Sequence, residues 1–218
     1  MIEMANIAAC FIVFALYELY LRWITLLMPM RLARSAHAAI RSNWVKAVMR
    51  RPGTEILVIQ TLRNSVMAAS FMATTAILAL TGTLTLSGIA NSDNGLWQAA
   101  STGSREPTLL AAKLLLLTGS FFVSFLFMAM AVRFFNHVGY LITGEATSKE
   151  AATEEANRKE TLAAAYLNRA GNYYSYGMRA FFACIPFLAG LLSTYFMFPA
   201  TCLLVLILYW FDRIPFDE

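Results

Sequence analysis

The stretch TLLAAKLLLLTGSFFVSFLFMAMAV, residues 108–132, contains a single charged residue, Lys113. A helix needs roughly 20 apolar residues to cross the roughly 30 Å of hydrocarbon in a lipid bilayer, so this stretch is long enough to do so. Pro107 precedes it, and proline is favoured in the first turn of a helix. The stretch therefore predicts a membrane-spanning helix and an integral membrane protein.

The composition of the whole chain favours the same interpretation. Of the 218 residues, 59% are hydrophobic and 14% are charged, whereas charged residues make up about a quarter of a soluble domain. Three further apolar stretches, at about residues 7–28, 65–89 and 178–211, are also long enough to span a bilayer. We therefore expect an all-α fold, in which residues 1–218 form a single membrane domain with a four-span helical bundle.

The last apolar stretch, residues 178–211, is longer than one crossing requires, because a continuous helix over it would extend about 50 Å. Pro186 and Pro199 can kink such a helix, and tilt can absorb its excess length. Two half-helices that form a re-entrant hairpin are the alternative, although exposed irregular backbone is costly inside the hydrocarbon. The sequence favours one long, kinked helix.

Basic residues are concentrated in two of the segments that connect the spans. Residues 30–63 and 133–177 hold most of the lysines and arginines, whereas the loop between the second and third spans has only Arg105. Basic loops remain on the cytoplasmic side of a membrane. We therefore expect both basic segments to be cytoplasmic and both termini to be periplasmic, in the inner (plasma) membrane of a bacterium. This placement explains the isoelectric point near 9.1 without a nucleic-acid partner.

Both cytoplasmic segments are expected to contain helices. Apolar and basic residues alternate at helical spacing from Met30 to Val48, which predicts a basic amphipathic helix at the level of the anionic lipid headgroups. Pro52 and Gly53 end this helix, and residues 147–169 favour a soluble helix rich in alanine and charge. The residues expected to contact headgroups are Arg31, Arg34, Arg41, Lys46, Arg50 and Arg51.

Glu18 and Arg22 are four residues apart in the first span, in the order that favours an ion pair on one helix face. A charge at membrane depth is costly without a partner. We expect Glu18 to pair with Arg22 or with an arginine of a neighbouring helix. Such a pair either locks the first helix against its neighbours or takes part in ion or proton movement.

Arginine, asparagine and histidine recur near the cytoplasmic ends of the other spans. Because arginine forks suit phosphate and carboxylate groups, one polar layer there can bind lipid headgroups, anions or acidic residues of a partner. Helix-end anchoring and capping is the alternative. We expect the layer to converge around an acidic group that offsets its charge. Convergence is expected of Arg63, Asn64, Arg133, Asn136 and Arg179, and the full candidate cluster adds His137, Asn168 and Arg169.

Catalytic and cofactor motifs are not evident in the sequence. Cys10, Cys184 and Cys202 lie inside apolar runs, which favours a packing role over metal binding. His37 and His137 both belong to the expected cytoplasmic segments, so neither is placed to hold a haem inside the membrane. We therefore expect no cofactor, no metal and no enzymatic activity.

Six short strings are typical of one family: WVKAVM (44–49), QTLRNSVMAAS (60–70), ATTAI (73–77), VRFFNH (132–137), LNRAG (167–171) and GMRAFF (177–182). Over roughly residues 40–212 the chain resembles the multi-pass membrane family catalogued as domain of unknown function 599, found in bacteria and plants. The family pattern is closer to Leu-Arg-Asn-Asn at 62–65 and to Arg-Tyr-Tyr at 133–135. The resemblance implies a four-span fold with its signature residues in the polar layer, and it supplies no activity.

The leading functional interpretation is a homo-oligomeric ion channel or channel-like transporter, because a single four-span bundle has little room for an aqueous pathway of its own. The alternative is a non-catalytic accessory or structural subunit of a larger membrane complex. A lipid-binding organiser, based on the basic helix at 30–48, is a third interpretation. The expected partners are membrane lipids with anionic headgroups, and either further copies of the chain or other membrane subunits.

Overall fold

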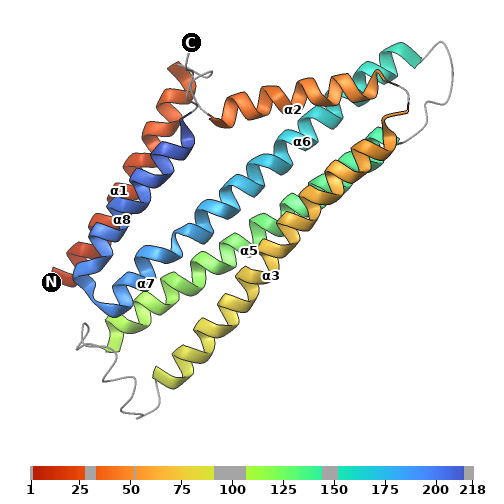
Figure 1. Ribbon diagram of the computed structural model, residues 1–218. Coiled ribbons are helices and arrows are strands. Elements are labelled where there is room, and N and C mark those ends of the chain that lie inside the picture. The colour runs from red at the N-terminus through yellow and green to blue at the C-terminus, as the bar shows by residue number, and fades with distance from the viewer. Residues whose placement is uncertain (1, 28–32, 52, 91–106, 144–151, 214–218) are drawn as a thin grey trace. The chain divides into compact units, whose positions relative to one another are not determined.

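The computed structural model describes residues 2–27, 33–51, 53–90, 107–143 and 152–213. These residues form helices almost throughout, as Figure 1 shows, so the all-α prediction is confirmed. In chain order the helices are α1 (Ile2–Leu27), α2 (Ala33–Met49), α3 (Glu55–Ala90), α5 (Pro107–Thr143), α6 (Ala152–Phe182), α7 (Cys184–Leu192) and α8 (Thr194–Asp212).

Five stretches of the described helices are long and apolar enough to cross a membrane. The expected membrane character is supported, whereas the count of four spans is not confirmed. The five stretches are Ala5–Ile24, Glu55–Thr85, Leu110–Ile142, Glu154–Leu192 and Thr194–Asp212.

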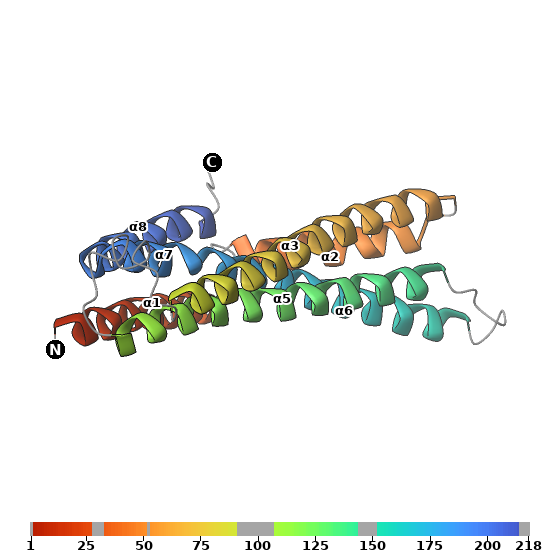
Figure 2. The same cartoon turned by 90° about the horizontal axis from the view of Figure 1, so that it is seen from below.

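The additional stretch arises because the apolar region at 178–211 is not one kinked helix. Ala183 separates α6 from α7, and Ser193, with an extended backbone (φ −159°, ψ 138°), separates α7 from α8. The chain reverses at Ser193, so α8 returns alongside α7 (Figures 1 and 2). Gly190 permits this close approach, since a Cβ there would lie 3.2 Å from Sδ of Met197. Pro199 lies inside α8 without ending it.

The chain divides into two compact units. Unit 1 comprises residues 1–33, 75–124 and 178–218, and unit 2 comprises residues 34–74 and 125–177. Helices α3, α5 and α6 each contribute to both units, whereas α1, α7 and α8 contribute to unit 1 and nearly all of α2 to unit 2.

In unit 1, α1 and α8 pack side by side and run in the same direction (Figures 1 and 2). Tyr17 and Leu21 form a buried apolar cluster with Leu204 and Leu208, and both helices start at the same end of the pair. The start of α1 and the end of α8 therefore lie at opposite ends of this helix pair. The prediction that both termini lie on one side of the membrane stays a prediction, since α8 is a candidate span by its length and composition.

In unit 2, aromatic side chains join α5 to α6. The Phe127 ring lies 6.0 Å from the Tyr173 ring, and the Phe134 ring lies 5.5 Å from the Tyr166 ring. The partner's number falls as the number along α5 rises, so the helices are antiparallel. The guanidinium of Arg169 lies 5.6 Å from the centre of the Phe134 ring, a cation–π contact that adds to this packing.

Candidate functional site

An arginine and two carboxylates from three helices form a hydrogen-bonded network in unit 1. Arg179 of α6 donates from Nη1 to Oε1 of Glu18 on α1, at 2.8 Å. Its Nη2 donates to both carboxylate oxygens of Asp212 at the end of α8, at 2.7 and 2.6 Å. The Tyr17 hydroxyl donates to Oδ2 of Asp212 at 2.5 Å. These four residues, the Arg179 network, tie α1, α6 and α8 together.

The Arg179 network lies in largely apolar surroundings and carries an excess of negative charge. The Arg179 side chain is 10% exposed, against 20% for Asp212 and 34% for Glu18. Tyr17 belongs to the buried cluster formed with Leu21, Leu204 and Leu208, so the network adjoins that cluster directly. Low polarity strengthens interactions between charges. With one guanidinium for two carboxylates, one negative charge remains without a protein counter-ion in the network.

The partner of Glu18 is Arg179 of a neighbouring helix and not Arg22, which is exposed on α1. Arg179 is favoured because its planar fork reaches two carboxylates at once, whereas Arg22 can leave the apolar surroundings for water. Sequence reasoning missed Tyr17 and Asp212 as members of the site. The only available signal was that an acidic residue ends the apolar stretch at 178–211.

A second set of polar contacts, the α2–α6 seam, lies in unit 2. Nε of Arg41 donates to Oδ1 of Asn168 at 3.0 Å, and Nδ2 of Asn168 donates to Oγ of Ser42 at 2.9 Å. Burial lowers the pKa of the Arg41 guanidinium, which nevertheless remains protonated at neutral pH. Gly171 makes room for this guanidinium, because a Cβ there would lie 2.6 Å from its Cζ.

Two further arginines, one in α2 and one directly after it, contact α6 on either side of Arg41. Nε of Arg50 lies 3.2 Å from Oε2 of Glu160, and Nη1 of Arg34 donates to the Tyr176 hydroxyl at 3.4 Å. As the residue number of the arginine rises, the number of its partner on α6 falls, so the two helices are antiparallel. The α2–α6 seam is thus defined by Arg34, Arg41, Ser42, Arg50, Glu160, Asn168 and Tyr176.

The seam assigns protein partners to arginines in and next to α2. Arg34, Arg41 and Arg50, which were expected to contact lipid headgroups, bond to polar groups of α6. The Arg50 side chain is nevertheless 69% exposed, so headgroup contact stays a prediction for these arginines. Lys46 and Arg51 are exposed, so headgroup contact stays a prediction for them. Arg31 lies outside the described residues.

The structure distributes the expected cytoplasmic cluster among several surroundings. Asn168 belongs to the seam, Arg169 stacks on Phe134, and Arg179 belongs to unit 1 with its own carboxylates. Convergence of the remaining members stays a prediction. Those members, Arg63, Asn64, Arg133, Asn136 and His137, are all exposed in unit 2.

A buried lysine links α5 to the start of α8. Lys113 is 1% exposed, and its Nζ donates to Oγ1 of Thr194, itself 3% exposed, at 2.7 Å. Thr194 directly follows the turn at Ser193, so this bond holds the turn against α5 in unit 1. Sequence reasoning gave Lys113 no role, although a lone charge in an apolar stretch is the pattern that marks such a residue.

Metal ligation has no support among the residues that the structure describes, where no three His, Cys, Asp or Glu side chains are grouped to hold an ion. Cys10 and Cys184 are buried, Cys202 is half-buried, and all three are free thiols.

Replacing Gly171 by alanine tests the α2–α6 seam. The new Cβ displaces the Arg41 guanidinium from Asn168, which removes a charged hydrogen bond worth about 1.5–3 kcal/mol. The gain in helix propensity from glycine to alanine, about 1 kcal/mol, offsets part of that loss. We expect Gly171→Ala to lower the free energy of unfolding, measured by denaturant titration in detergent. The matched variant Gly82→Ala, whose Cβ meets nothing within 4 Å, should raise it; equal effects of the two would contradict the seam.

Five candidate spans, three of which contribute to the Arg179 network, define the class: a multi-pass integral membrane protein. The chain belongs to the family described as "Protein of unknown function, DUF599", whose model matches residues 5–215. The resemblance carried by the six sequence strings is thus confirmed. No curated protein and no solved structure matches the chain.

Proposed function

We propose that the protein is a channel-like transporter for protons or monovalent cations, and that the Arg179 network is its ion-handling site. The observation that carries this proposal is the charge of the network, in which two carboxylates share one guanidinium. An unpaired charge is costly in apolar surroundings. A proton or a small cation therefore has to accompany the second carboxylate when bilayer and protein enclose the network, and its uptake and release is the elementary step of transport.

Glu18 is the carboxylate that exchanges the ion. Asp212 is held by both of its oxygens on Arg179 and accepts a further hydrogen bond from Tyr17. Glu18 is bound by Arg179 through Oε1 and is the more exposed of the two, at 34% against 20%. Arg179 and Tyr17 act as positioning residues that keep Asp212 fixed.

The orientation that fits this function has five spans in the bacterial inner membrane, with a periplasmic N-terminus and a cytoplasmic C-terminus. The basic residues of α2 and those around residues 149–169 then lie on the cytoplasmic side, as the positive-inside rule requires. Glu18 and Asp212 both lie toward the cytoplasmic ends of their helices. Helix α3, with 36 residues, extends about 54 Å, so its N-terminal part continues beyond the hydrocarbon into the cytoplasm.

The transporter works as a homo-oligomer, with the ion pathway between subunits. A few helices per chain leave little space for an aqueous path, and α1, which carries Glu18, has the large exposed apolar residues Leu16, Leu19 and Trp23 on its surface. Such side chains suit contact with lipid or with a second copy.

An accessory role in a larger membrane complex is supported by the surface of α3 in unit 2. Ile56, Ile59, Met67 and Phe71 are each at least 49% exposed, and Arg63 is exposed among them. An arginine within an apolar stripe suits a protein partner better than lipid hydrocarbon.

Reconstitution separates these two functions. Purified protein in vesicles of phosphatidylethanolamine and phosphatidylglycerol should dissipate an imposed proton or potassium gradient, followed with an internal pH-sensitive dye and a potassium-selective electrode. Vesicles without protein provide the control. Gradients that persist equally in both preparations would favour the accessory role.

A further inference from the structure

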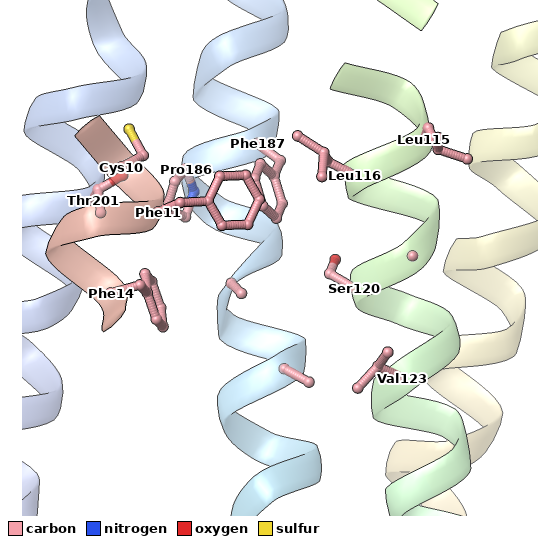
Figure 3. Close-up of a pocket in the computed structure, with 13 residues that line it drawn as sticks. Cys10, Phe11, Phe14, Leu115, Leu116, Ser120, Val123, Pro186, Phe187 and Thr201 are labelled. Carbon is pink, nitrogen blue, oxygen red and sulfur yellow. The ribbon is translucent and has the colours of Figure 1, made fainter. Parts of the chain in front are cut away.

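A partly open cavity of about 370 Å³ lies in unit 1, and none of its lining residues belongs to the Arg179 network or the α2–α6 seam. Residues of α1, α5, α7 and α8 line it, together with Ala180 of α6 and Ala183, which lies between α6 and α7. In Figure 3, Phe11 of α1 and Phe187 of α7 extend toward Leu116, Ser120 and Val123 of α5. The two phenylalanine rings lie 6.3 Å apart and form one wall of the cavity.

The lining offers an occupant apolar contacts and no charge. Its polar side chains are Ser120, Thr201 and Cys10. Ser120 donates to the carbonyl oxygen of Leu117, and Thr201 donates to that of Met197. Because the hydroxyls of Ser120 and Thr201 already donate to carbonyls of their own helices, these donors need no polar group from a ligand.

Filling a space with this lining by water is unfavourable, and leaving it empty is unfavourable too. A water molecule needs two to four polar partners, so apolar cavities in proteins remain dry. An empty cavity of this size deprives its lining of packing contacts, and small-molecule sites begin at roughly 300 Å³. Gly119 increases the free space, because a Cβ there would meet nothing within 4 Å.

We propose that this cavity is a binding site for one acyl chain of a bilayer phospholipid. The helices that line it belong to candidate spans, so the cavity lies at the depth of the hydrocarbon. The surrounding hydrocarbon supplies alkyl chains at high local concentration. Its uncharged lining complements an alkyl chain, and the headgroup remains outside the cavity. This site does not depend on the proposed transport function.

Photolabelling tests the site in the full-length protein. The probe is a phosphatidylglycerol whose acyl chain carries a diazirine, incorporated in vesicles of phosphatidylethanolamine and phosphatidylglycerol. After extraction into detergent, bound lipid is photolysed and the labelled residues are mapped by mass spectrometry. We expect label on Phe11, Leu116 and Phe187, and a loss of label from the outward-facing Leu203 and Leu206 of α8, which contact lipid that detergent removes.

Filling the cavity provides the control within the protein. Gly119→Phe should abolish label on Phe11 and Phe187, whereas Gly82→Phe, which adds the same ring at an exposed glycine of α3, should leave it unchanged. Ser120→Leu serves the same purpose if Gly119→Phe fails to fold. Label that is equal at cavity and outward-facing residues, or that persists in the folded filled variant, would overturn the proposal. Retention of detergent alone, seen by native mass spectrometry, would also overturn it.

Discussion

Replacing Arg179 by alanine is expected to lower the free energy of unfolding by about 3–5 kcal/mol, the effect of removing one partner from a buried ion pair. Arg179 is the only cation among the four residues of its network, and its loss removes the charged hydrogen bonds that its guanidinium donates to Glu18 and Asp212. The contacts between α1, α6 and α8 that run through its guanidinium are lost at the same time. Denaturant titration in mixed detergent micelles, followed by circular dichroism, measures the change.

Arg22→Ala is the matched control, because Arg22 is an exposed arginine one turn along α1 from Glu18. Surface substitutions of this kind change stability by about 0.5 kcal/mol or less. The triple variant Arg179→Gln, Glu18→Gln and Asp212→Asn removes all three charges and should recover much of the loss. Equal stability of the Arg179→Ala and Arg22→Ala variants would show that the network holds no helices together.

Reporters fused to the two ends of the chain are expected to give opposite signals. Helices α1 and α8 run in the same direction in unit 1, so crossings made by both place the N-terminus and the end of α8 on opposite sides of the membrane. A reporter active in the periplasm should work before residue 1, and one active in the cytoplasm should work after α8.

A third fusion, between α5 and α6, provides the reference for the cytoplasmic side, since the neighbouring residues 149–169 are rich in lysine and arginine. The C-terminal reporter should match it. If the two terminal reporters instead agree with each other, the four-span arrangement with both termini outside is correct, and α7 and α8 form a re-entrant hairpin.

The sequence was sufficient for those properties that depend on local composition. Long apolar runs predict helices wherever they occur, and the expected break near Gly53 does separate α2 from α3. Gly53 adopts φ +83°, a left-handed conformation that favours glycine. The family was also recognisable, because short strings such as QTLRNSVMAAS persist in order along the chain.

Properties that depend on contacts between distant residues were not predictable. Glu18 and Arg179 are 161 positions apart, and nothing local distinguishes Arg179 from Arg22 as a partner. The partners of Arg41 were likewise not predictable, because the surface of α6 that it contacts, with Asn168 and Gly171, is known only from the fold. The break at Ser193 was hidden because an apolar run has the same composition whether it continues or reverses.

The central claim, that Glu18 exchanges an ion within the Arg179 network, is tested most directly by the flux of protons or potassium through vesicles that contain Glu18→Gln. The glutamine can still accept the hydrogen bond from Arg179, and it removes the excess negative charge, so the fold should persist while flux falls to the level of protein-free vesicles. Glu155→Gln, at an exposed glutamate of α6 that pairs with Lys159, should retain the wild-type flux. Wild-type flux in a folded Glu18→Gln variant would contradict the claim.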